Sequence, residues 1–107
     1  MPFCTYRNLA VWEKAMDFTL AVYDKTACFP KEEKYGLKSQ LRKAAVSISS
    51  NIAEGFGRKS DNELRYFLNM ARGSLMEAET QVILSEKPGY LNSDCAAILL
   101  ESSAEIG

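Results

Sequence analysis

The sequence has 107 residues, of which 47% are apolar and 25% charged, with a formal net charge of −1. This composition is typical of one globular domain over residues 1–107, and it excludes disordered and membrane-spanning classes because no apolar run approaches the roughly 20 residues that a span needs. The lack of histidine argues against zinc sites and against the commonest acid–base chemistry.

The first predicted helix spans residues 9–28. Phe29-Pro30 ends it, because the residue before a proline is pushed out of the helical region. The following PKEEKYG begins with a proline and two nearby acids, which fits a short helical turn. Side chains suited to a core recur at steps of three and four, the spacing of one helix face. They are Trp12, Ala15, Met16, Thr19, Leu20 and Tyr23, flanked by Val11, Phe18 and Val22.

The second predicted helix spans residues 37–55. Its apolar face consists of Leu37, Leu41, Ala44, Ala45, Ile48, Ile52 and Ala53. Gly55 and Gly57 are expected to stop it, because glycine accepts the left-handed conformation that closes many helices.

A polar strip runs beside this apolar face, and it is the candidate interface of the chain. Small side chains let another helix approach closely, and a serine hydroxyl can bond the carbonyl one turn back. A close-packed helix or subunit interface is therefore the favoured interpretation. A solvated face and a ligand or nucleic-acid contact remain alternatives. The strip comprises Ser47, Ser50, Asn51 and Glu54.

The third predicted helix spans residues 61–86. Ser60-Asp61-Asn62-Glu63 fits a capping box, in which the Ser60 hydroxyl accepts the Glu63 amide and the Glu63 side chain returns to the Ser60 amide. Pro88-Gly89 marks the turn after the helix. Its apolar seam consists of Leu64, Phe67, Leu68, Ala71, Leu75, Ala78, Val82 and Ile83.

A fourth helix is predicted over residues 93–106. Long helices joined by short linkers predict an all-α, antiparallel up-and-down four-helix bundle. The fourth helix is about half as long as the third, so we expect either more chain or a neighbouring subunit to cover the rest of the bundle.

Charge is unevenly distributed along the chain. Residues 31–72 carry nine basic and five acidic groups, whereas residues 73–107 carry one basic and six acidic groups. This asymmetry marks either a surface for polyanions or complementary surfaces of neighbouring subunits. The candidate nucleic-acid or anion contacts are Lys34, Lys38, Arg42, Lys43, Arg58, Lys59, Arg65 and Arg72.

Aromatic residues flank this basic segment. Tyr35, Phe56 and Tyr66 can stack on exposed bases, although aromatic residues beside helix ends more often plug a core or an interface. Arg58 and Lys59 adjoin the start of the third helix, where free amides favour anions, but nearby acidic residues compete for the same field.

The inventory of reactive groups does not favour an enzyme. Ser47 and Lys43 have the spacing of a Ser–Lys pair, but no oxyanion-stabilising element accompanies them. Glu54 with Glu77 or Glu79 could pair as carboxylates, yet acids on helices are usually solvated or salt-bridged. We expect no catalytic residue, cofactor, metal or small-molecule substrate.

Cysteines and the N-terminal segment give two further expectations. Cys4, Cys28 and Cys95 form no C-x-x-C pair and predict neither a disulfide framework nor a metal site. Cys28 and Cys95 are expected to be small buried side chains. The N-terminal MPFCTYRNL lacks the features of a secretory signal, so we expect a cytoplasmic protein.

Three stretches carry a resemblance that spans nearly the whole chain. They are YRNLAVWEKAMDF (Tyr6 to Phe18), FPKEEKYGLKSQLRKAAVSISSNIAEGFGR (Phe29 to Arg58) and ELRYFLNMARGSLMEAETQ (Glu63 to Gln81). On these residues the chain resembles the four helix bundle proteins, also called 23S rRNA-intervening-sequence proteins. The run SNIAEGFGR after LRKAAVSI is the most specific part of the match.

The resemblance implies an antiparallel four-helix bundle that assembles into a ring-like homopentamer. Members are encoded within intervening sequences of bacterial 23S rRNA genes or stand alone, and most have no assigned activity. A related branch, the accessory variability protein of diversity-generating retroelements, is a strongly basic pentamer that binds nucleic acid and a reverse transcriptase.

The chain departs from the family pattern at three points. Ser49 replaces a common helix-kinking proline, and Lys87-Pro88-Gly89-Tyr90 replaces the usual leucine before the glycine, which should shorten the third helix. The slightly acidic total charge means that tight binding to nucleic acid would need several clustered cations.

Two functional hypotheses follow. The first is a self-associating, nucleic-acid-associated accessory protein without catalytic activity. The second is an assembly or protein-binding module without affinity for RNA or DNA.

Overall fold

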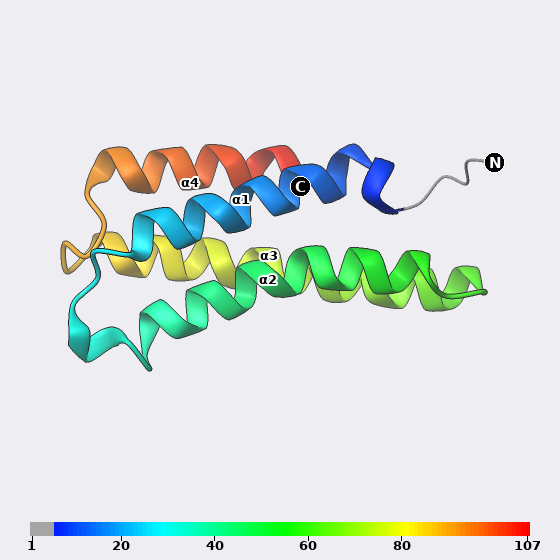
Figure 1. Cartoon of the computed structure of the whole chain (residues 1–107), viewed down its shortest axis with the longest axis horizontal. Coiled ribbons are helices and arrows are strands. Elements are labelled where there is room, and N and C mark those ends of the chain that lie inside the picture. Colours follow the sequence, from blue (N-terminus) through cyan, green and yellow to red (C-terminus); the bar gives the residue numbers. More distant parts are fainter. Residues whose placement is uncertain (1–5) are drawn as a thin grey trace.

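The computed structural model describes residues 6–107, which form four α-helices, two short 3-10 helices and no strand. Helix α1 spans Ala10–Thr26, α2 Leu37–Phe56, α3 Asp61–Glu86 and α4 Ser93–Ile106. The 3-10 helices η1 (Tyr6–Asn8) and η2 (Lys31–Glu33) precede α1 and α2. The chain reverses direction at each connection between α-helices (Figure 1), so the predicted all-α up-and-down bundle is confirmed. Cys4 lies outside the described residues.

Each helix packs against two others. Helix α1 contacts α2 and α4, and α3 contacts the same two helices. The bundle measures 47 × 21 × 19 Å. Figure 1 shows that the α2–α3 hairpin projects beyond the ends of α1 and α4. We call this projecting part, residues 55–67, the hairpin tip; the opposite end, made by residues 27–36 and 87–92, is the loop end.

The core lies along the inner faces of all four helices. Two threonines of α1 are also buried, and their hydroxyls are satisfied: Thr19 Oγ1 donates to Ala15 O at 2.8 Å and approaches Ala45 O of α2 at 3.1 Å. The buried apolar residues are Ala15, Phe18, Val22, Phe29, Leu41, Ala44, Ala45, Ile48, Ile52, Ala71, Leu75, Ala78, Val82, Leu91, Ala96 and Leu99.

Four residues that the periodicity assigned to apolar faces are exposed. Leu20 is 64% exposed, Ile83 47%, Tyr23 43% and Leu68 37%. Each helix touches only two neighbours, so the contact arc is narrower than the sequence stripe. In α3 the short α4 also leaves the region around Leu68 uncovered, as the relative lengths of the helices predict.

The loop end is closed by buried side chains. Phe29 and Leu91 are 6% and 2% exposed. The Tyr90 ring packs against Phe29 with their centroids 5.6 Å apart. Gly89 has a φ of +88°, which places the turn after α3 in the region that favours glycine.

The structure confirms one half of the predicted capping box and changes the other. Ser60 Oγ accepts the Glu63 amide at 3.1 Å. The Ser60 hydroxyl also lies 3.1 Å from Glu63 Oε1 and donates to it, whereas the sequence predicted a bond from the Ser60 amide to that side chain.

Helix α2 ends at the predicted place, between Gly55 and Gly57, but the predicted left-handed conformation was wrong. Gly57 has a φ of −87°, so no left-handed residue closes the helix. Gly55 lies within α2 and is buried, and a Cβ there would come within 3.1 Å of Leu64 Cδ1 and Phe67 Cβ. Gly55 is therefore needed for the close approach of α2 and α3.

The expected burial was also wrong for Cys28, which is exposed, whereas Cys95 is partly buried and packs against the core. Cys28 follows the last turn of α1 on the side away from the core, and its Sγ lies 3.6 Å from Lys25 O.

Candidate nucleic-acid interface

A basic hollow lies on the outer side of the first half of α2. Its volume is about 670 Å³. Residues of α1, of the η2 connection and of α2 contribute to it, so three consecutive segments meet there. Its lining residues are Tyr23, Lys34, Tyr35, Lys38, Ser39, Arg42, Lys43, Val46 and Ser47. Among the described residues that line it are four cations and no carboxylate. We call this site the basic hollow.

The frame of the hollow is built by Glu33. One carboxylate oxygen, Oε1, accepts the amide of Leu37 at 2.9 Å and caps α2. The other, Oε2, accepts the Tyr90 hydroxyl at 3.1 Å and ties η2 to the α3–α4 turn. This hydrogen bond, and secondly the negative charge of Glu33, raise the pKa of Tyr90 above its ordinary value of 10.0. The connection that carries Lys34 and Tyr35 is thus held at both ends.

Gly36 makes this cap fit. A Cβ at Gly36 would lie 2.7 Å from Glu33 Oε1, too close unless the carboxylate moves. The residue before α2 is therefore small because the capping carboxylate occupies the space beside it.

Arg42 belongs to the same frame. Its Nε donates to Thr26 Oγ1 at 2.8 Å and its Nη2 donates to Tyr23 O at 3.0 Å, which joins α2 to the last turn of α1. Its guanidinium also lies over the Tyr23 ring, 4.4 Å from the centroid. A cation at a helix C-terminus is favourable because the last carbonyls carry partial negative charge.

The three lysines of the hollow form no ion pair with a carboxylate of the described chain. The ion pairs within residues 6–107 are Lys25–Asp24 and Arg58–Glu54, so none involves Lys34, Lys38 or Lys43. Lys34 and Lys43 are exposed and Lys38 is partly exposed. Their charges are directed to the surface rather than to carboxylates of the same chain.

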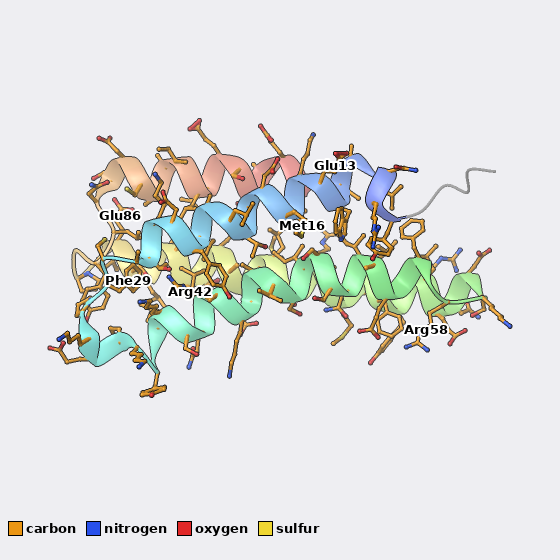
Figure 2. The ribbon with its side chains drawn as sticks, in the orientation of Figure 1. Glu13, Met16, Phe29, Arg42, Arg58 and Glu86 are labelled. Carbon is orange, nitrogen blue, oxygen red and sulfur yellow. The ribbon has the colours of Figure 1, made fainter. Side chains whose placement is uncertain are left out.

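The eight predicted cationic contacts do not form one surface. Four line the basic hollow, whereas Arg58, Lys59 and Arg65 belong to the hairpin tip. Figure 2 shows Arg42 in the first half of α2 and Arg58 far from it, beyond the C-terminal end of that helix. Arg58 bonds Glu54 Oε2 at 3.2 Å and lies 4.7 Å from the Phe67 centroid.

Arg72, the eighth candidate, lines a second hollow of about 350 Å³ where α4 ends. Apolar side chains from all four helices, among them Val11, Ile52, Leu75 and Ile106, surround it.

The predicted interface strip is divided in the structure. Ser47 Oγ accepts from Ser74 Oγ of α3 at 2.8 Å and from Asn51 Nδ2 at 2.9 Å, and Asn51 Nδ2 also donates to Ser47 O. Ser47 thus lies at the α2–α3 contact of one chain, and Asn51 bonds to it from the next turn of α2. Ser50 and Glu54 are exposed, and Glu54 is paired with Arg58.

Groups considered for catalysis have other partners. The Ser47 hydroxyl bonds Ser74 and Asn51, not Lys43. Glu79 Oε2 accepts the hydroxyl of the buried Ser103 at 2.7 Å, a bond that joins α3 to α4.

Sequence reasoning missed Tyr23, Ser39 and Val46 as lining residues of the basic hollow. Tyr23 was assigned to the apolar face of α1, although it is 43% exposed. Tyr23 lies at the edge of that face, two turns before Pro30, and this position was the one sequence signal that it could be exposed. No pattern in the sequence singles out Ser39 or Val46.

Residues 7–107 match the family described as 23S rRNA-intervening sequence protein. The chain belongs to this family. Its structure is similar to the crystal structure, at 1.70 Å, of a protein of unknown function from the S23 ribosomal protein family of Bacteroides thetaiotaomicron VPI-5482. The TM-score is 0.83 at 20% sequence identity, over 91% of each chain, so the likeness concerns the fold.

The sequence has no match among curated proteins. Within residues 6–107, no helix has both the length and the apolar character needed to cross a membrane.

Proposed function

We propose that this member of the 23S rRNA-intervening sequence protein family is a non-enzymatic, cytoplasmic accessory protein that self-associates and binds nucleic acid through the basic hollow. The observation that carries the proposal is the gathering of Lys34, Lys38, Arg42 and Lys43 in one concave site. Basic side chains bind phosphates and release the counterions that surround nucleic acid. The protein needs no cofactor for this role.

The hollow offers three cations that its own fold does not use, because Arg42 is engaged by α1. Contact with three phosphates corresponds to a salt slope of about −2 for a single strand and about −3 for a duplex. This is weak binding for one protomer. An oligomer that presents several hollows to one strand would strengthen it through multivalency.

Exposed apolar side chains support self-association. Leu20 is 64% exposed, and Leu84 and Ile98 are 49% and 48% exposed. Burial of such side chains between protomers would stabilise an oligomer, with about 25 cal/mol gained for each Å² removed from water. A homopentamer is the state that family resemblance implies.

Binding can be tested with the full chain, a labelled RNA and two salt concentrations, about 50 and 200 mM. Lys34→Glu with Lys38→Glu should abolish salt-dependent binding. Lys59→Glu with Arg65→Glu is the matched control, since it makes the same change of net charge at the hairpin tip. No salt-dependent retention of the unmodified protein on RNA at low ionic strength would refute the proposal.

The second candidate is an assembly or partner-binding module without affinity for nucleic acid. The same exposed apolar residues favour it. Light scattering should then give an oligomer mass that does not depend on RNA, and Ser50→Leu should change that mass while helicity stays constant, because Ser50 is exposed on α2. An unchanged mass for Ser50→Leu would exclude Ser50 from the interface.

A further inference from the structure

We infer that the basic hollow binds single-stranded nucleic acid in preference to a duplex, with one base stacked on Tyr35 and the adjacent phosphates on Lys34, Lys38 and Lys43. This inference rests on the proposed function. It adds that the ligand is single-stranded rather than duplex nucleic acid, and that Tyr35 is the residue that distinguishes the two.

Tyr35 is placed as a stacking platform. Its side chain is 85% exposed, the largest exposed fraction among the large apolar and aromatic residues of the described chain. The backbone beneath it is fixed, because Lys34 N bonds Lys31 O and Gly36 N bonds Glu33 O, both at 3.1 Å. A ring that is exposed and held on a tied connection binds an incoming base without first ordering the chain.

The neighbouring Tyr23 shows why Tyr35 is the platform. The Arg42 guanidinium lies 4.4 Å from the Tyr23 centroid and is fixed there by two hydrogen bonds. That face of Tyr23 is occupied. In contrast, Tyr35 has only the flexible Lys34 ammonium at 5.4 Å. Lys34 can move from the ring to a phosphate when a base arrives.

Charge surrounds the platform at a suitable spacing. Lys38 and Lys43 are five residues apart on α2, about 7.5 Å along the helix axis. Both line the same hollow as Tyr35 and Lys34. A short segment of backbone can therefore contact two or three cations while one base reaches the ring.

A duplex can use only the cations of this arrangement, through its phosphates. Its bases are stacked inside and are read through the grooves by a projecting helix or ribbon. The Tyr35 ring, 85% exposed beside Lys34, offers its face to an unpaired base and not to a base stacked inside a duplex. Single strands expose base faces, and stacking on an aromatic side chain contributes about 1–3 kcal/mol per base.

The test measures fluorescence anisotropy with the full chain and three labelled probes of equal length, about 12 nucleotides, within the site sizes of single-strand binders. The probes are a single-stranded RNA, the corresponding RNA duplex and a strand of abasic nucleotides with the same phosphates. Tyr35→Ala should weaken binding of the single-stranded RNA about tenfold. Tyr35→Phe should retain most of that affinity. The abasic strand should bind the unmodified protein and Tyr35→Ala equally.

The outcomes separate this inference from the proposed function. If Tyr35→Ala binds the single-stranded RNA normally while Lys34→Glu with Lys38→Glu does not, the stacking role is overturned and the proposed function stands. If the duplex binds as tightly as the single-stranded RNA or more tightly, the preference for single strands is overturned and the proposed function still stands. Absence of salt-dependent binding to every probe overturns both. Because Tyr35 is exposed, circular dichroism of Tyr35→Ala should match that of the unmodified protein.

Discussion

The two ends of the bundle use the same basic segment of sequence in different ways. At the loop end and in the adjoining first turns of α2, Glu33 and Arg42 hold the backbone together, and Lys34, Lys38 and Lys43 remain at the surface without ion pairs. At the hairpin tip, Arg58 is paired with Glu54 and covers the ring of Phe67. The comparison teaches that each end has one arginine engaged by its own chain, Arg42 and Arg58, and that such an arginine is not free for a ligand.

The ends also differ in how they are closed. Phe29 and Leu91 plug the loop end, whereas Phe56 and Tyr66 at the hairpin tip are 45% and 58% exposed. Among the helices of residues 6–107, only α2 and α3 extend to the tip (Figure 1). The loop end should therefore contribute more to the stability of an isolated chain, and the tip should tolerate more change.

The largest expected difference is between two phenylalanines. Phe29→Ala removes a buried plug and should lower the free energy of unfolding by about 3–5 kcal/mol. Phe56→Ala, at an exposed position, should cost less than about 1 kcal/mol. Urea denaturation of both variants measures the contrast. Equal losses would mean that the tip is as well packed as the loop end.

The hairpin tip has one tight point, at Gly55. Gly55→Ala places a Cβ against Leu64 and Phe67, whereas Gly73→Ala on α3 has no described neighbour within 4 Å. Both changes gain helix propensity, about 1 kcal/mol. Their difference in unfolding free energy should therefore be the overpacking cost, about 1–3 kcal/mol, with Gly55→Ala the less stable. Equal stabilities would show that the two helices separate without cost.

Arg42 and Arg58 test whether an arginine that joins two helices contributes more to stability than one in an exposed ion pair. Arg42→Gln breaks the hydrogen bonds to Thr26 and Tyr23 and should lower stability by about 1–2 kcal/mol. Arg58→Gln removes an exposed ion pair and should cost about 0.2–1 kcal/mol. Thermal unfolding at low and high salt checks both. A loss for Arg58→Gln as large as that for Arg42→Gln would contradict the distinction.

The smallest expected effect concerns Tyr90. Because Glu33 raises its pKa, the protonated phenol stabilises the folded state at neutral pH, and this contribution disappears as the pH rises through the raised value. The advantage of the unmodified protein over Tyr90→Phe should therefore shrink above about pH 10. Urea midpoints from pH 7 to 11 measure it, and Glu33→Gln should weaken the same dependence. A constant difference would mean that the Tyr90–Glu33 bond does not contribute.

Much of the fold follows from local signals. The periodicity of the apolar residues predicts four helices, Ser60 and Glu63 predict the start of α3, and Pro88-Gly89 predicts the turn after it. The periodicity did not predict the width of each buried face correctly, since Leu20, Leu68 and Ile83 are exposed. A helix buries only the arc that its neighbours cover, and the sequence of one helix does not state how many neighbours it has.

The candidate site was predictable in part. The sequence identifies the cations but not their division between the two ends of the bundle. It also placed Tyr23 in the core, although that ring packs under Arg42 at the surface. The engagement of Arg42 with α1 depends on a contact between residues 16 and 19 positions apart in the chain, which spacing within one helix cannot show.

The sequence by itself determined the helices, the family and the basic character of residues 31–72, because helical periodicity, capping and charge are local properties. Only the tertiary structure decided which cations are available, which aromatic ring is exposed and why Gly55 and Gly36 are small. Those properties depend on which residues of other helices or turns lie next to a given side chain. These neighbours are distant in the sequence and come together only when the folded chain packs.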